Sequence, residues 1–178
     1  MISQPSSHHR KSVRLKEFDY SQPGAYFITI VTKNRQSLFG KVINGKVQLN
    51  PIGLIVQEEW LSTPRIRQDV ELGEWIIMPN HLHGIIILKD IVGARSPVPL
   101  PDPYQIERFG KPTSGSIPTI IRSIKATTTK RINLYRTTPG QEVWQRGFFE
   151  HVIKNDQDYQ NHATYILTNP ERFGIDKD

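Results

Sequence analysis

The chain has 178 residues and no cysteine, and its 23 lysines and arginines outnumber its 17 aspartates and glutamates, for a net charge of +6. This length suits one domain with its own core. The absence of cysteine excludes disulfides and thiolate metal sites, and no apolar run reaches the roughly 18–20 residues of a membrane-spanning helix. The positive charge favours a polyanionic partner, most simply nucleic acid, although charge that serves solubility alone gives the same composition. The first residues contain no apolar stretch that could act as a secretory signal, so we expect a cytoplasmic protein.

The expected elements follow one another as strand, hairpin, helix, two strands, helix, strand and a last helix. Strands are predicted where aromatic and β-branched residues cluster, and helices where apolar residues recur three to four positions apart. Asn44-Gly45 supplies the positive φ angles of a hairpin turn, and Asn50-Pro51 is typical of a helix start. The predicted segments are a strand from Tyr26, a hairpin over 37–50, a helix from Pro51, strands over 70–79 and 81–89, a helix from Ser116, an extended segment over 142–153, and a helix from Asn155 that stops at Pro170.

Without the hairpin and the last helix, this order is β-α-β-β-α-β. It predicts an α+β fold with a ferredoxin-like (RRM-like) antiparallel sheet and helices on one face. We expect a basic amino-terminal arm over 1–20 and a single domain over 21–178, in which the Pro-, Gly- and Ser-rich segment 91–115 forms an exposed loop. The last helix is surplus to this fold, and surplus elements often carry the function.

His81 and His83 alternate with Leu82 inside one of the most strand-like stretches of the chain. Side chains two positions apart in a strand project from the same face, so the two imidazoles point together. They can offer two neutral nitrogens to one divalent ion, which also needs a third protein ligand. Surface or hydrogen-bonded structural histidines would show the same spacing, so the metal site is a hypothesis at this point.

The last helix carries two stripes at helical spacing. One is apolar and is expected to pack on the sheet, whereas the other is polar throughout. On the polar stripe, Tyr165 and Asn169 lie one turn apart, so a phenol and an amide oxygen can face the same place, an arrangement that a phosphoryl-transfer site could use. An exposed aromatic residue and a helix-ending Asn would give the same pattern, and spacing alone favours that plainer interpretation. The stripes are Tyr159, Ala163 and Ile166, and His162, Tyr165 and Asn169.

Taken together, these residues resemble the single-tyrosine HUH transposases, and especially the REP-associated tyrosine transposases of bacteria. The family's motif of histidine, bulky hydrophobic residue and histidine is matched by His81-Leu82-His83. Its catalytic helix, with a tyrosine, three residues and an amide side chain, is matched by Tyr165-Ile-Leu-Thr-Asn169. Segments 10–30, 109–133 and 143–153 are also similar to the family, so the resemblance covers nearly the whole chain.

The resemblance implies a metal-dependent single-stranded DNA endonuclease and strand transferase that cuts next to hairpin DNA. Tyr165 is the implied nucleophile, which forms a 5′-phosphotyrosine and releases a 3′-hydroxyl. His81, His83 and Asn169 are the implied ligands of Mg²⁺ or Mn²⁺, which stabilises charge on the phosphate oxygens. A phenol with a pKa of about 10 needs help at neutral pH. Candidate proton carriers are His151 and His162.

The implied partner is single-stranded or hairpin DNA, bound by a monomer or by a homodimer that exchanges its last helix, without a membrane. Basic side chains are expected to contact phosphates, although each would serve equally as solvated surface charge. The candidates are Arg10, Lys11, Arg14, Arg122, Lys125, Lys130, Arg131 and Arg146.

Two other classes of protein compete with this interpretation. Metal-dependent hydrolases with a His-x-His pair use a barrel of roughly 250 residues with the motif on its first strand, whereas this chain is shorter and its motif lies mid-chain. The other class is a non-cleaving nucleic-acid-binding module that recognises hairpin DNA on an RRM-like sheet. Such modules place aromatic residues on the sheet face, where the central strand here carries His81 and His83. The non-cleaving module is kept as the alternative.

Overall fold

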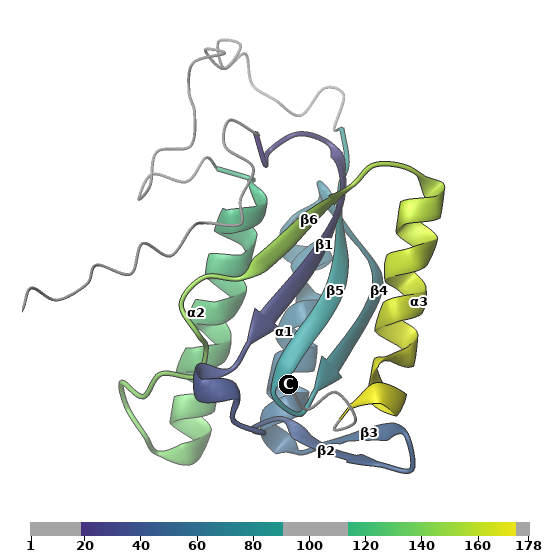
Figure 1. The fold of residues 1–178 in the computed structure, drawn as a ribbon. Helices are drawn as coiled ribbons and strands as arrows, with labels where there is room; N and C mark the ends of the chain where they lie inside the picture. The colour runs from purple at the N-terminus through teal and green to yellow at the C-terminus, as the bar shows by residue number, and fades with distance from the viewer. Residues whose placement is uncertain (1–18, 91–113, 174–178) are drawn as a thin grey trace, which may run out of the picture.

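A computed structural model describes residues 19–90 and 114–173 of the chain (Figure 1). Most of the expected arm (1–18) and most of the expected loop (91–113) lie outside the described residues. The elements are β1 (Gly24–Val31), the short 3-10 helix η1 (Lys33–Arg35), β2 (Gly40–Ile43), β3 (Lys46–Leu49), α1 (Pro51–Ile66), β4 (Val70–Met78), β5 (His81–Leu88), α2 (Ile117–Arg136), β6 (Phe149–Ile153) and α3 (Asp156–Arg172).

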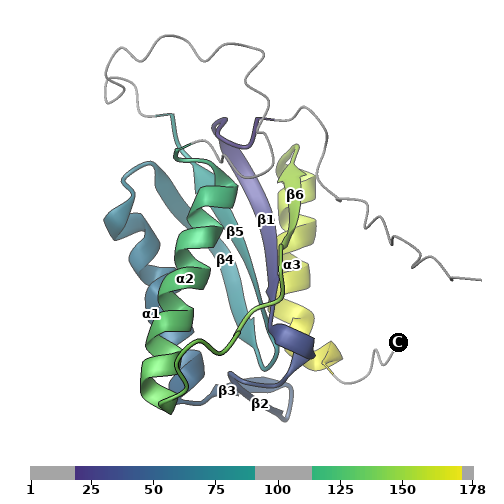
Figure 2. The ribbon, with the colours of Figure 1, turned by 90° about the vertical axis from the view of Figure 1, so that its left-hand side faces the viewer.

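The main sheet has the strand order β4-β5-β1-β6, and every neighbouring pair is antiparallel. Figure 2 shows α1 and α2 side by side on one face of this sheet and α3 alone on the other. The prediction of an α+β, ferredoxin-like sheet with an extra carboxy-terminal helix is therefore confirmed. None of the helices in the described ranges is long and apolar enough to cross a membrane.

The main core fills the space between the sheet and the pair α1 and α2. Alternate residues of the two central strands point into it, among them Ile28 and Ile30 of β1 and Leu82 and Ile86 of β5, all with no exposed surface. Trp60 of α1 is also fully buried against them. Burying each such side chain stabilises the fold by about 1.5–3 kcal/mol. The alternating pattern therefore determines which face of each central strand packs into the core, and the opposite face is left for function.

Local sequence signals set most element boundaries. Asn50 Oδ1 accepts hydrogen bonds from the backbone N–H groups of Ile52 and Gly53, both at 2.9 Å, so the predicted start of α1 is confirmed. The predicted turn is confirmed as well, since Asn44 and Gly45 both have positive φ.

Two predicted boundaries were wrong. α3 continues past Pro170 to Arg172, because a proline in the last turn removes only one intrahelical hydrogen bond. The extended segment expected over 142–153 forms a strand only from Phe149, and upstream of it Trp144 makes an isolated bridge to Thr32.

The second face of the sheet is only half covered. α3 lies mainly over β4, and a small core forms where Ala163 and Ile166 of α3 meet Phe27 of β1 and Ile85 of β5. Among the described residues, no helix covers the part of this face over β1 and β6, as Figure 1 shows. This uncovered part becomes the floor of the candidate site.

Candidate active site

Cross-strand pairing aligns side chains in rows on the face beneath α3. His83 of β5 pairs with Thr29 of β1, which in turn pairs with Phe149 of β6. One step along the sheet, His81 pairs with Val31. Paired residues of antiparallel strands project from the same face, so all five side chains belong to this face.

The two histidines lie together on a central strand, as predicted. Their ring centroids are 4.5 Å apart, and Leu82 between them is fully buried in the core on the opposite face. Burial lowers the pKa of His83 to about 3 and is the main cause that lowers the pKa of His81 to about 4. Both imidazoles are therefore neutral at pH 7, the form that binds metal ions.

Hydrogen bonds at Nδ1 orient both rings. Asn80 Nδ2 donates to the backbone carbonyl of Arg35 at 3.3 Å, which turns its Oδ1 toward His81 Nδ1 at 2.6 Å. Because that oxygen can only accept, His81 carries its proton on Nδ1 and has a lone pair on Nε2. His83 Nδ1 lies 2.8 Å from Thr29 Oγ1, and its buried Nε2 has no hydrogen-bond partner within the described residues. Partners of this kind at the second nitrogen are typical of histidines that bind metals.

Asn169 of α3 reaches the same place. Its side chain is buried and hydrogen-bonds to His81, which partly offsets the lowering of that histidine's pKa. Two neutral imidazoles, an unpartnered buried nitrogen and one amide side chain suit a divalent ion. The structure thus brings together the three residues that the sequence suggested as ligands.

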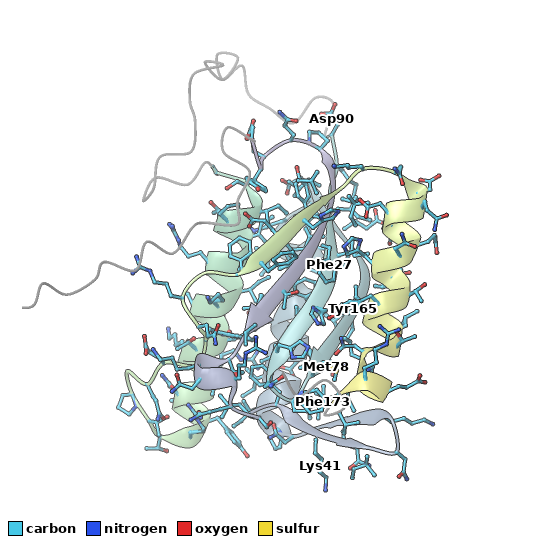
Figure 3. All side chains as sticks on the ribbon, viewed as in Figure 1. Phe27, Lys41, Met78, Asp90, Tyr165 and Phe173 are labelled. Atoms are coloured by element: carbon cyan, nitrogen blue, oxygen red, sulfur yellow. The ribbon has the colours of Figure 1, made fainter. Side chains whose placement is uncertain are left out.

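Tyr165 lies one turn before Asn169, and Figure 3 shows it between α3 and the central strands, near Phe27. Its ring centroid is 5.2 Å from that of His83, and 40% of its surface is exposed. Tyr159 on the same helix differs, because its hydroxyl donates to Glu74 Oε2 at 2.8 Å and burial raises its pKa to about 12. Tyr165 therefore presents its phenol to the open side, whereas Tyr159 is fixed against β4, as the apolar stripe predicted.

These groups line an open cleft of about 670 Å³, within the usual size range of small-ligand sites. Arg35 is the cation among its lining residues, and none of the described lining residues carries a carboxylate. The cleft therefore suits an anionic ligand. It is lined by Phe27, Thr29, Val31, Arg35, His81, His83, Phe149, Asn161, His162 and Tyr165.

The two candidate proton carriers meet around Asp158. His151 Nε2 lies 2.9 Å from Asp158 Oδ2, and His162 Nδ1 lies 3.2 Å from Oδ1 and 2.9 Å from the backbone carbonyl of the same residue. The hydrogen bond from His151 is the largest cause that lowers the pKa of Asp158. The three ligand atoms lie within 4.8 Å of one another, a spacing at which they could share an ion. Hydrogen bonds alone account for the arrangement, since each imidazole N–H has an oxygen of Asp158 as acceptor.

The basic residues proposed to contact phosphates do not gather at the cleft. Lys125 Nζ donates to the carbonyls of Gln145 and Gly147 at 2.5 and 2.9 Å, and burial lowers its pKa to about 8. Arg131 pairs with Glu58 and Glu59. The positions of these two cations therefore do not support a role in DNA binding.

The other proposed phosphate contacts have varied locations. α2 lies on the face opposite the cleft, and its residues Arg122 and Lys130 are exposed there. Arg146 is exposed in the segment before β6. The remaining three, Arg10, Lys11 and Arg14, lie outside the described residues.

Sequence reasoning missed several groups in and around the cleft. Arg35 and its neighbour Asn34 both have positive φ, at 54° and 53°, a conformation that no local motif announces. Thr29 comes next to His83 only through the pairing of β1 with β5, which no local motif predicts. Asn80 directly precedes His81 in the chain, so the sequence could have identified it. Phe149 of the edge strand β6 shares the face on which the central strand β5 carries the histidines, and sequence reasoning did not identify it.

No family model matches the chain. An uncharacterized protein of Haemophilus influenzae is 40% identical over 164 residues, which are 92% of this chain and 89% of that protein. A REP-associated tyrosine transposase of Escherichia coli is 26% identical over 157 residues, which are 87% of this chain and 71% of that protein. A solved REP-associated tyrosine transposase bound to a REP hairpin superimposes with a TM-score of 0.58 at 24% identity, over 88% of this chain and 72% of the other.

The superposition shows that this ferredoxin-like sheet with its additional helix is the fold of a solved transposase. Together with the relatives that are similar in sequence, this superposition places the protein among enzymes of the transposase kind. The chain belongs to the family of REP-associated tyrosine transposases.

Proposed function

We propose that this protein is a metal-dependent nuclease and strand transferase that cuts single-stranded DNA next to a hairpin, with Tyr165 as the nucleophile. The observation that carries the proposal is the meeting of Tyr165 with the imidazoles of His81 and His83 in one cleft, whose described lining carries no carboxylate. Asn169 is hydrogen-bonded to His81 beside it. Family membership and a solved relative with a bound REP hairpin support DNA as the partner.

In the proposed reaction, Tyr165 Oη attacks the phosphorus of a scissile phosphodiester. A bond forms between Oη and phosphorus while the bond from phosphorus to the 3′-oxygen breaks. The phenol loses its proton to a base, and the leaving 3′-oxygen takes up a proton and becomes a hydroxyl. The 5′ end of the cut strand stays attached to the tyrosine, and the reverse reaction rejoins strands.

His81, His83 and Asn169 would hold a divalent ion, Mg²⁺ or Mn²⁺, with the Nε2 atoms and the amide oxygen as donors. When bound, that ion supplies positive charge to the phosphate oxygens in the transition state. The side chains around it have separate tasks. Asn80 keeps the proton of His81 on Nδ1, the Thr29 hydroxyl can accept an Nδ1 proton from His83, and the imidazoles enter the site neutral because they are buried.

We assign proton transfer to His162, which lines the cleft and lies three residues before Tyr165. Its Nδ1–H is held by Asp158, so its Nε2 has a free lone pair to accept the phenol proton. The ring of His151 stacks on His162 with centroids 4.7 Å apart and donates to the same carboxylate. Asp158 thus orients the base in the way a carboxylate orients histidine in other nucleophilic sites.

The test is a covalent-adduct assay with single-stranded hairpin DNA and Mn²⁺. Wild-type protein should give a protein–DNA species that survives a denaturing gel, and mass spectrometry should map the attachment to Tyr165. Tyr165→Phe should bind DNA and form no adduct. Tyr159→Phe is the matched control, since it removes the hydroxyl of the tyrosine that is fixed to Glu74, and it should still cleave. An adduct on Tyr159 would overturn the assignment, and hairpin binding without any adduct in the wild type would favour the non-cleaving alternative.

A further inference from the structure

Phe149 is an exposed aromatic residue in the cleft for which the proposed chemistry has no use. It lies on the edge strand β6 with 43% of its surface exposed, in the same cross-strand row as Thr29 and His83. We propose that its ring stacks on an unpaired base of the DNA strand, next to the phosphate that is cut. This inference rests on the proposed function, because it takes the cleft as the place of the scissile phosphate.

The ring of Phe149 contacts a buried aromatic ring and is otherwise partly exposed to solvent. Phe27, which is only 4% exposed, meets Phe149 with centroids 6.3 Å apart and planes at 70°, an edge-on contact. Such a contact holds the ring in place. Single exposed aromatic residues are common on protein surfaces, so exposure alone does not indicate a ligand. Position distinguishes Phe149, which lines the cleft, from Tyr135 of α2, which is 57% exposed on the opposite side of the sheet.

The charges in the cleft indicate where the phosphate and the base of a nucleotide would lie. Arg35 follows the end of β1 beside His81, and its charge lowers the pKa of that histidine. A phosphate is therefore best placed at this end, between the guanidinium and the two histidines. Phe149 lies at the other side of the cleft, two strands away from His83, which is about 10 Å at the usual strand spacing. That span is of the order of one nucleotide, from its phosphate to the far edge of its base.

A polar group near the ring suits the edge of a base. Asn161 of α3 lines the cleft together with Phe149, and its amide can exchange hydrogen bonds with a base. This position calls for an unpaired base, because a paired base has its hydrogen-bonding edge occupied. Stacking tolerates any base, since each has a π face. Phe149 should therefore strengthen binding of single strands generally rather than select a sequence.

The experiment is a double-mutant cycle on binding, in the Tyr165→Phe background so that no strand is cut. The probe is a fluorescein-labelled DNA hairpin with oligothymidine extensions, and its partner carries abasic extensions that keep every phosphate. Removing one stacked base typically weakens binding roughly 5- to 150-fold. We expect Phe149→Ala to weaken binding of the oligothymidine probe by a factor in this range and to leave binding of the abasic probe nearly unchanged, whereas Phe149→Trp should retain full affinity.

Tyr135→Ala is the control for loss of an exposed aromatic residue away from the cleft, and it should bind both probes like the parent. Circular dichroism and thermal melting establish that each variant is folded. Equal weakening of both probes by Phe149→Ala, or no weakening of either, would overturn the stacking proposal. Binding is measured with divalent ions chelated, so that no metal-dependent cleavage occurs even if Tyr165 is not the nucleophile, and the result stays interpretable in that case.

Discussion

The hydrogen bond between Thr29 and His83 offers the sharpest test of whether the fold orients His83 as a metal ligand. Thr29 Oγ1 lies 2.8 Å from His83 Nδ1, and His83 is 4% exposed, so water has little access to replace the hydroxyl. Thr29→Val keeps the shape of the side chain and removes the oxygen. The buried Nδ1 then loses its hydrogen-bond partner, at a cost of about 1–3 kcal/mol in the free energy of unfolding. The ring also loses the group that can hold its proton on Nδ1, so the proton can move to Nε2, the atom that would bind the proposed metal ion.

Loss of a partner behind a metal-binding histidine typically weakens metal binding by about 10- to 100-fold. We therefore expect Thr29→Val to bind Mn²⁺ more weakly by this factor, measured by electron paramagnetic resonance of free Mn²⁺, and to unfold at lower urea concentration. Thr29→Ser keeps the hydroxyl and should bind Mn²⁺ like the wild type. If Thr29→Val were less stable yet bound Mn²⁺ with unchanged affinity, His83 would not be a ligand through Nε2.

Two further predictions follow from the same site. With divalent ions chelated, the free energy of unfolding should fall as the pH drops from about 6.5 toward 4. The folded-state pKa values of His81 and His83, about 4 and 3, lie below the unfolded value, so the unfolded chain binds more protons in this window. The loss should be on the order of 2 kcal/mol for each histidine between pH 7 and pH 4.5, and urea titrations of His83→Gln should show a shallower fall. Because α3 packs on the sheet of its own chain, a mixture of Tyr165→Phe and His83→Ala proteins should not regain cleavage on a gel, whereas recovery would indicate helix exchange between subunits.

The placement of the histidine pair could be predicted because it depends on local pattern alone. In a strand, alternation decides the face, and the apolar surroundings of Leu82 leave no doubt about which face is buried. The same holds for α3, where helical spacing separates the stripe of Tyr159 from that of Tyr165. The β-α-β-β-α-β order does not include the last helix, so the meeting of the two motifs follows from where α3 packs on the sheet.

The partners of long charged side chains could not be predicted. Lys125 and Arg131 look like solvated cations on a helix, and nothing near them in the chain identifies the carbonyls or the glutamates that bind them. After β1 the backbone adopts positive φ at Asn34 and Arg35, and this turn brings Arg35 into the cleft. Neither residue is a glycine, the residue type that most often has positive φ, so the sequence does not predict the turn. Phe149 was missed since its face depends on its pairing with Thr29, not on any motif.

The packing of α3 explains why one helix carries both a fixed and a free tyrosine. A β-carbon at Gly73 of β4 would lie 2.5 Å from Tyr159 Oη, so the glycine leaves the space that this hydroxyl occupies. Tyr159 fills this space and is bound by Glu74, which anchors the helix over β4 rather than over the middle of the sheet. The polar stripe is thereby turned toward the uncovered strands, where Tyr165 meets His83. The asymmetric position of α3 thus leaves the cleft open and turns Tyr165, the proposed nucleophile, toward it.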